Sequence, residues 1–255
     1  MGNAFRGIVC GFCLTGLAAI SESADKQVRF SIRPQFGVAM PEFRRVRELL
    51  NSFVAGSGVT QVSGETGMAM AVGLEGGYLL KPELGDKGRL GVFFKGGMLT
   101  GELKATGTGL SAPVVGSLKN RLITLAGGIW AEGGRGKGFH YRSGVGFGLG
   151  LASSTANYSG PGFSTSYPLS GSGLVFDVSG EWGYAVQKDI RIYLQAGYLV
   201  ANIKKMGLSS SVDFNKDGVI GSGEAEGSLL SDTRGRPLAF NFSGPRSQLG
   251  FAVGF

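Results

Sequence analysis

The sequence predicts an all-β fold, an eight-stranded antiparallel up-and-down transmembrane β-barrel. Three observations lead to this prediction: strands that alternate large apolar residues with small or polar ones, connections that alternate between long and short, and 47 glycines among 255 residues. Alternation at period two places the apolar side chains on one face of a strand. The nearly bare opposite face suits the crowded interior of a small closed barrel.

Residues 1–23 are predicted to be a secretory signal peptide. Arg6 gives the segment a positive start, Ile8–Ile20 is an apolar run, and Ser23 supplies a small residue for cleavage. The run is shorter than the roughly 20 residues that span a membrane as a helix. Both cysteines of the chain lie within this segment. The barrel domain, residues 24–255, is therefore expected to have no disulfide.

Eight stretches alternate over at least the roughly 9–11 residues that a tilted membrane strand needs. The clearest places large side chains at the odd positions of Phe139–Leu151 and mostly glycine at the even ones. The eight predicted strands are Val28–Met40, Met68–Leu80, Leu90–Thr100, Leu118–Ala131, Phe139–Leu151, Leu174–Val186, Ile190–Val200 and Leu238–Phe255. Exposed aromatic side chains near the strand ends are expected to form interfacial girdles: Tyr78, Tyr141, Trp182, Tyr184, Tyr198 and Phe255.

The strand over 118–131 can face either way. Two sets compete for the outward face: Ile123, Leu125 and Ile129, or Leu122, Ala126 and Trp130.

The last strand shows an apparent change of phase. Phe240 and Phe242 are even-numbered, whereas Leu249 is odd-numbered, which predicts a β-bulge near residues 243–245. The first and last strands each contain a proline, which cannot donate to the ladder. A closing seam with fewer hydrogen bonds is therefore expected.

The connections alternate in length. Long ones are expected at about 41–66, 104–117, 152–172 and 203–237, and short ones at about 81–88, 132–138 and 187–189. Short periplasmic turns and long outer loops are typical of outer-membrane barrels. A soluble lipocalin-like barrel, with its large residues inside, is the alternative. In the first long loop, Phe43, Val46, Leu50 and Phe53 recur at helical spacing, which predicts a short amphipathic helix.

The chain ends in Leu249–Phe255, an alternating strand with a terminal aromatic residue. This ending resembles the C-terminal signature of bacterial outer-membrane β-barrel proteins, and the eight-strand pattern resembles the OmpA-type barrel. The resemblance implies export to the bacterial outer membrane, contact with its lipid, a monomer and a plugged interior.

Charged residues recur on the predicted inner face of the barrel. They are Arg33, Glu75, Lys95, Arg142, Asp177, Glu181 and Arg191. Isolated charges there would be costly, so neighbouring strands are expected to pair them. The expected pairs are Arg33–Glu75, Glu75–Lys95, Arg142–Glu181 and Glu181–Arg191. A structural plug is favoured over a narrow, porin-like ion or solute channel because eight strands leave just enough room for side chains.

Residues 213–224 match the twelve-residue calcium loop of EF-hand proteins. The expected ligands are the side chains at positions 1, 3, 5 and 12 and the carbonyl at position 7: Asp213, Asn215, Asp217, Glu224 and Val219. Gly218 allows the sharp turn at position 6. The flanks form a poor entering helix and no second loop follows, so one weak Ca²⁺ site is expected, with Kd of roughly 10⁻⁴–10⁻³ M. A merely polar loop is the alternative.

No catalytic residue is expected, and the chain is predicted not to be an enzyme. His140 is the only histidine, and it lies beside a short, periplasmic turn, at the wrong end for an enzyme acting on outer-leaflet lipid. A lipid-modifying enzyme is therefore the least favoured class. The formal charge of +7 is scattered, and no nucleic-acid-binding module is present.

The favoured function is that of a non-enzymatic surface protein whose outer loops bind calcium and an unknown extracellular partner. Basic residues near the outer rim could meet the phosphates of lipopolysaccharide or simply be solvated: Arg44, Arg45, Arg47, Lys104, Lys119, Lys204 and Lys205.

Overall fold

The computed structural model describes residues 30–42, 50–51, 54, 61–65, 68–84, 88–108, 113–134, 138–187, 189–213, 219–231 and 235–254. Eight long strands make up most of it: β1 (Phe30–Ala39), β3 (Ala69–Leu84), β4 (Gly88–Thr108), β5 (Val114–Gly133), β6 (Phe139–Gly160), β7 (Phe163–Ala185), β8 (Ile190–Ile203) and β11 (Gly244–Gly254). Three short strands accompany them: β2 (Gln61–Glu65), β9 (Gly207–Leu208) and β10 (Phe240–Asn241). Within these described ranges, no helix is long and apolar enough to cross a membrane.

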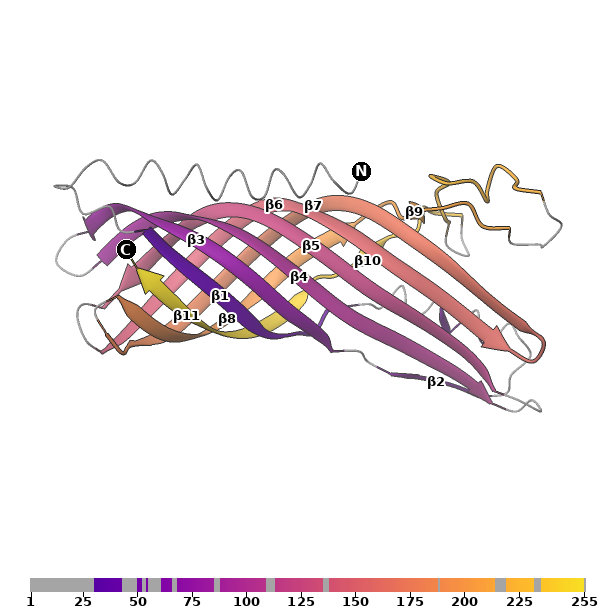
Figure 1. The fold of residues 1–255 in the computed structure, drawn as a ribbon, viewed down its shortest axis with the longest axis horizontal. Helices are drawn as coiled ribbons and strands as arrows, with labels where there is room; N and C mark the ends of the chain where they lie inside the picture. Colours follow the sequence, from indigo (N-terminus) through magenta and orange to yellow (C-terminus); the bar gives the residue numbers. More distant parts are fainter. Residues whose placement is uncertain are drawn as a thin grey trace.

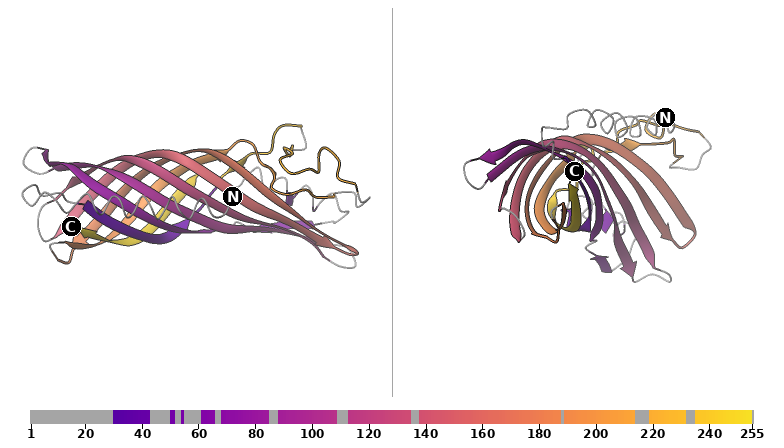
Figure 2. Two further views of the ribbon diagram at one scale, coloured as in Figure 1. Left: turned by 45° about the horizontal axis from the view of Figure 1, so that its top comes forward. Right: turned by 60° about the vertical axis from the view of Figure 1, so that its left-hand side comes forward.

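The eight long strands close into a ring. Each pairs antiparallel with the next in the order β1, β3, β4, β5, β6, β7, β8 and β11, and β11 pairs back onto β1. Figure 1 shows the tilted strands wrapped into a barrel, and the right panel of Figure 2 shows it obliquely from one end. The predicted eight-stranded antiparallel barrel is confirmed.

The outward face of the ring carries an apolar belt. On β6 the exposed side chains are Phe139, Tyr141, Val145, Phe147, Leu149 and Leu151, and Phe139 is 85 % exposed. Phe139 to Leu151 covers about 40 Å at ~3.3 Å per residue, or roughly 28 Å of thickness at a tilt of ~45°. An outward apolar band about 25 Å tall is the lipid-facing surface of a transmembrane barrel. The predicted girdle residues Tyr78, Tyr141, Trp182, Tyr184 and Tyr198 are all exposed on this face.

The belt ends along a line that crosses three long strands. Met98, Ile123 and Leu151 are cross-strand partners in its last apolar layer. The strands continue beyond this line with polar outward positions, and β4–β7 project past the shorter strands in Figure 1.

These extensions correct the expected loops. The segments 104–117 and 152–172 are mostly paired strand rather than irregular loop, because β4 runs on to Thr108 and β6 to Gly160. The alternation of side chains continues there, but the apolar positions now point inward. Alternation with the apolar side chains outward ends at the edge of the belt, so it does not predict this continuation.

The open question of the strand at 118–131 is resolved. Leu118, Leu122, Ala126 and Trp130 are buried in the interior, and Ile129 is 58 % exposed on the outer face.

The predicted bulge near residues 243–245 is wrong. The register of β10 with β8, Phe240 opposite Ile203, continues unshifted into β11, with Gly244 opposite Leu199. Phe240 and Phe242 are buried and face inward, so the phase never changes. The large side chains change sides because this part of the chain lies beyond the lipid-facing belt. There the outer face of the strand meets water, and apolar residues are favoured on the inner face.

The closing seam is paired over fewer described residues than the neighbouring pair of β1 and β3. The pairing of β1 with β11 lapses at Arg33 and Pro34, whereas all ten residues of β1 are paired with β3. The predicted signal peptide and Phe255 lie outside the described residues, as does most of the predicted helix at 43–53. Within it, Leu50 is described as helical and buried, and so is Val54, the residue after its predicted end.

Two layers fill the barrel interior. Charged and amide side chains occupy the part surrounded by the belt. An apolar core, called the outer core below, fills the barrel beyond the end of the belt. The outer core includes Leu103, Leu122, Ile203, Phe240 and Phe242, each no more than 2 % exposed. The boundary between the two layers follows the end of the belt.

Candidate functional site

Seven charged side chains from six strands, each at most 9 % exposed, form the centre of the charged layer. They are Arg33, Glu75, Lys95, Arg142, Asp177, Glu181 and Arg246. Alternation brings them together because each occupies an inward position of its strand. Arg33, Glu75, Lys95, Arg142, Asp177 and Glu181 were predicted for this interior. Arg246 was missed, although it shares the even-numbered, inward face of β11.

Ion pairs join opposite walls of the barrel. Arg142 on β6 places Nη2 2.6 Å from Glu75 Oε1 on β3. Arg33 on β1 donates to Glu181 on β7, and its Nε lies 3.8 Å from Glu75 Oε1. These contacts link four strands through two arginines and two glutamates.

A second group adjoins the first. Arg246 donates to both carboxylate oxygens of Asp177, and Lys95 Nζ lies 3.8 Å from Asp177 Oδ2. The amide oxygens of Gln195 and Gln248 each lie 3.4 Å from Lys95 Nζ. The lysine is thus surrounded by one carboxylate and two amide oxygens.

The expected pairing needs correction. Arg33–Glu75 is confirmed, but Glu75 takes Arg142 in place of Lys95, and Glu181 takes Arg33 and His140 in place of Arg142. Long arginine side chains reach across the narrow lumen, whereas the prediction considered only neighbouring strands.

Arg191 lies apart from this network. It pairs with Glu132, with 2.5 Å between Nη1 and Oε1, rather than with Glu181. Glu132 was placed in a turn by its sequence, but β5 continues to Gly133 and turns this carboxylate inward.

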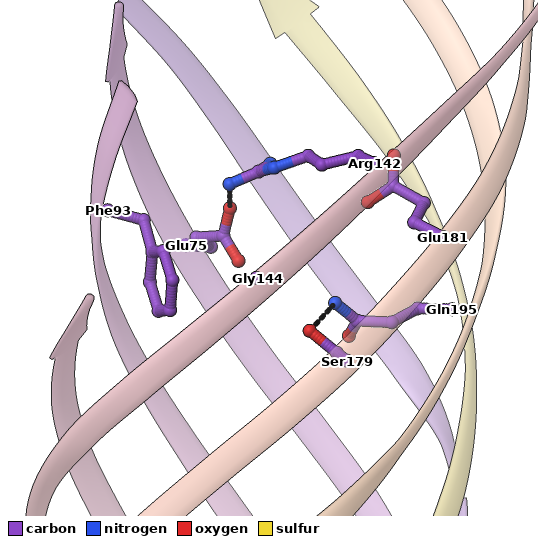
Figure 3. A pocket seen from close by; sticks show the side chains of 7 residues that line it. All are labelled: Glu75, Phe93, Arg142, Gly144, Ser179, Glu181 and Gln195. Atoms are coloured by element: carbon purple, nitrogen blue, oxygen red, sulfur yellow. Dashed lines mark hydrogen bonds and ion pairs between the residues drawn. The ribbon is translucent and has the colours of Figure 1, made fainter. Parts of the chain in front are cut away.

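A cavity of about 10 Å³ lies inside the charged layer. Its lining comprises Glu75, Phe93, Arg142, Gly144, Ser179, Glu181 and Gln195. Figure 3 shows Arg142 reaching toward Glu75 above, and Gln195 donating to Ser179 Oγ below, at 3.2 Å. A space of this size holds about one water molecule, so it is too small for a solute path.

Aromatic side chains hold the arginines in place. The Arg33 guanidinium lies 4.4 Å from the Tyr193 ring centroid, and that of Arg142 lies 4.6 Å from the Trp130 centroid. The Trp130 indole donates to the Val92 carbonyl at 3.1 Å. Each guanidinium is therefore fixed by a carboxylate and by an aromatic face.

His140 points into the barrel. It is 8 % exposed, and its Nε2 lies 3.5 Å from Glu181 Oε1. The ring packs over Gly183, where an added Cβ would lie 2.2 Å from His140 Cε1. The histidine is thus one more member of the charged layer.

The outer core closes the barrel above the charges. Segments outside the ring contribute to it: Leu50 and Val54 from the first connection, and Met206, Leu208 and Leu238 from the last. Leu50 packs against β5, where an added Cβ at Gly116 would lie 2.8 Å from Leu50 Cδ1. The outer end is therefore packed with apolar side chains.

The calcium-loop candidate is described at both ends. The Val212 amide donates to the Glu224 carbonyl at 2.8 Å, so the residue before position 1 of the loop lies beside position 12. The Gly221 amide donates to Glu224 Oε2 at 2.7 Å, so this carboxylate turns back over the loop. Asn215 and Asp217 lie outside the described residues. Within the described residues, no cluster of three acidic, histidine or cysteine side chains with metal-binding geometry is present.

No protein-family model matches this chain, and no curated protein matches it. Solved structures that are similar include OprG from Pseudomonas aeruginosa, with 16 % identity over 90 % of this chain and 97 % of that one, and a TM-score of 0.48. Ail, the attachment invasion locus protein of Yersinia pestis, crystallised with the heparin analogue sucrose octasulfate, has 12 % identity over 90 % and 100 %, and a TM-score of 0.38. Neisserial surface protein A has 9 % identity over 89 % and 97 %, and a TM-score of 0.37. At these values the likeness transfers neither a ligand nor an activity to this chain.

Proposed function

We propose that this protein is a non-enzymatic outer-membrane barrel that anchors a surface-exposed β-structure and a calcium-binding loop. One observation carries this proposal: β4–β7 continue past the apolar belt. Leu151 to Gly160 alone adds about 30 Å of strand at ~3.3 Å per residue. Strands that outlast the lipid-facing surface place a polar sheet outside the membrane, where it can meet a partner.

The loop at residues 213–224 is the part of this surface for which a ligand can be named. Asp213, Asn215, Asp217, Glu224 and the Val219 carbonyl would hold Ca²⁺. The hydrogen bond between Val212 and Glu224 supports this assignment because it holds the two ends of the loop close, and the first and last ligands of a calcium loop must meet at one ion. Bound calcium would cross-link the loop and make it resistant to cleavage.

Limited proteolysis of the refolded barrel tests this proposal. Millimolar calcium should slow cleavage within residues 203–237, and Asp213→Ala or Glu224→Ala should abolish the protection. Glu226→Ala is the matched control, because Glu226 is an exposed carboxylate two positions beyond the loop. Cleavage that calcium leaves unchanged in the wild type, or protection lost equally in the control, contradicts the calcium site.

A narrow channel is the competing function, and the charged lumen is what favours it. The packed outer core and the small volume of the cavity in the lumen, about 10 Å³, argue against a channel. Planar-bilayer recordings of the refolded protein should show no steady conductance. Reproducible unitary currents would favour the channel and contradict the plug.

An enzyme acting on lipid is the third class. His140 would be its histidine, yet it lies inside the barrel beside Glu181 and away from the lipid-facing surface. We expect His140→Ala to leave the lipid composition of producing cells unchanged. A changed lipid profile in that variant would reopen the enzymatic class.

A further inference from the structure

Two cations lie just beyond the last apolar layer of the belt on β5. Arg121 and Lys119 are exposed and point outward at successive outward positions. Arg121 has Thr100 on β4 and Ser153 on β6 as its cross-strand partners, and Lys119 has Glu102 on β4 and Thr155 on β6. A hydroxyl therefore stands beside each cation on the next strand.

Neither cation forms an ion pair among the described residues, although Glu102 lies opposite Lys119 in the register. The Glu102 carboxylate lies 3.8 Å from Lys104 Nζ, so its ion pair is with Lys104, the third outward cation of this wall. Arg121 was absent from the basic rim expected from the sequence, although it lies in the predicted strand at 118–131. The register between β4, β5 and β6 brings it into the group.

The Arg121 side chain lies against the belt itself. Its Nε is 3.2 Å from the sulfur of Met98, which belongs to the last apolar layer. The guanidinium is thus at the level where acyl chains end and headgroups begin. An arginine fork binds two phosphate oxygens at once, while serine and threonine hydroxyls donate to others.

We propose that the wall formed by β4, β5 and β6 binds the phosphate of a lipid headgroup in the outer leaflet. Arg121 and Lys119 hold the phosphate, and Thr100, Ser153 and Thr155 supply hydroxyl donors. The apolar residues next to these cations indicate that the phosphate belongs to a lipid. Met98, Ile123 and Leu151 offer a surface for acyl chains, which a free phosphate does not have. The inference rests on the proposed location of the barrel in an outer membrane.

The test compares lipids that differ only in phosphate. Binding of diphosphoryl lipid A and of its dephosphorylated form to the purified protein in detergent micelles is measured by native mass spectrometry. The wild type should retain the phosphorylated lipid. The combined change Lys119→Gln and Arg121→Gln should weaken binding about tenfold for each cation removed, to the level of the dephosphorylated lipid.

Lys204→Gln with Lys205→Gln is the control for net charge: these exposed lysines of the expected basic rim follow β8, outside the wall of β4, β5 and β6, and the proposal leaves them solvated. It should change binding by no more than about twofold. Equal weakening in the control, or no weakening in the Lys119/Arg121 variant, overturns the site. Inorganic pyrophosphate that binds as tightly as the lipid overturns the lipid as its source.

Membrane insertion is read separately. Trp182 is 58 % exposed on the belt, whereas Trp130 is buried inside. Brominated acyl chains should therefore quench Trp182 in every variant. Absence of quenching in the wild type would contradict the membrane location itself. Quenching of Trp182 together with equal binding of the phosphorylated and dephosphorylated lipids would contradict only the headgroup site.

Discussion

Arg142 on β6 and Glu75 on β3 meet across the barrel interior, with 2.6 Å between Nη2 and Oε1. Both side chains are at most 6 % exposed. Since Glu75 also faces Arg33, one carboxylate serves two guanidinium groups. The walls of the barrel are therefore linked through their contents as well as through their hydrogen bonds.

Glu75→Gln should destabilise the barrel because it leaves buried cations without their compensating charge. Breaking a buried ion pair from one side costs about 3–5 kcal/mol. Urea unfolding of the refolded protein in micelles, followed by tryptophan fluorescence, measures the loss. Glu102→Gln removes a partly exposed carboxylate and should cost about 0–1 kcal/mol. Equal losses for the two variants would show that the network contributes no more than a surface pair.

Gly91→Ala should impair folding, whereas Gly96→Ala on the same strand should be tolerated. A Cβ at Gly91 would lie 2.3 Å from both the Tyr78 carbonyl oxygen and the Trp130 ring. Backbone cannot yield as a flexible side chain does, and overpacking of this kind typically costs about 1–3 kcal/mol or more. At Gly96 the nearest atom, in Leu125, is 3.7 Å away, an ordinary contact.

The heat-dependent shift in electrophoretic mobility of the folded barrel checks this pair. The Gly91 variant should yield less folded protein than the Gly96 variant. A reversed order would mean that β4 does not pass this closely beneath Trp130.

Phe240→Ala should loosen the outer end while leaving the membrane-embedded part folded. Phe240 is 1 % exposed in the outer core, and truncation of a buried phenylalanine costs about 3–5 kcal/mol. We expect new proteolytic cuts beyond the belt, mapped by mass spectrometry, with an unchanged mobility shift. Leu229→Ala, at a residue that is 54 % exposed, serves as the control. Global unfolding of the Phe240 variant would show that the two layers do not behave independently.

Stability should fall as the pH rises above about 10. Tyr158 lies beyond the belt, and burial, followed by the nearby Tyr167, raises the pKa of Tyr158 from 10.0 to about 12. Between these values the unfolded chain ionises this hydroxyl while the folded chain does not, so ionisation favours unfolding. Tyr158→Phe should show a flatter dependence in urea unfolding between pH 9 and pH 11. Identical slopes in the two proteins would contradict the burial of this hydroxyl.

The barrel itself could be predicted because lipid imposes a simple rule on sequence. A lipid-facing position must be apolar and its neighbours need not be, so β6 can be recognised from Phe139–Leu151 alone. The same rule led to the wrong prediction of a bulge in the last strand. Phe240 and Phe242 are large and apolar but lie inside, because beyond the belt water surrounds the barrel and the apolar core moves to its interior.

The site could be predicted in its members but not in its contacts. The inward positions of Arg33, Glu75 and Glu181 follow from strand alternation. Their partners do not, because the distance across a closed ring depends on how all eight strands tilt and close. Arg246 and Glu132 were missed for a related reason: a false change of phase and a strand that runs longer than its apolar part.

By itself, the sequence determined the strand number, the apolar belt and the charged character of the lumen, since each follows from a period of two along a single strand. Only the tertiary structure decided which opposite charges meet, how far β4–β7 extend and that Arg121 stands beside Ser153 at the edge of the belt. The physical reason is that these relationships depend on the register between strands, and register is set by packing of the whole ring.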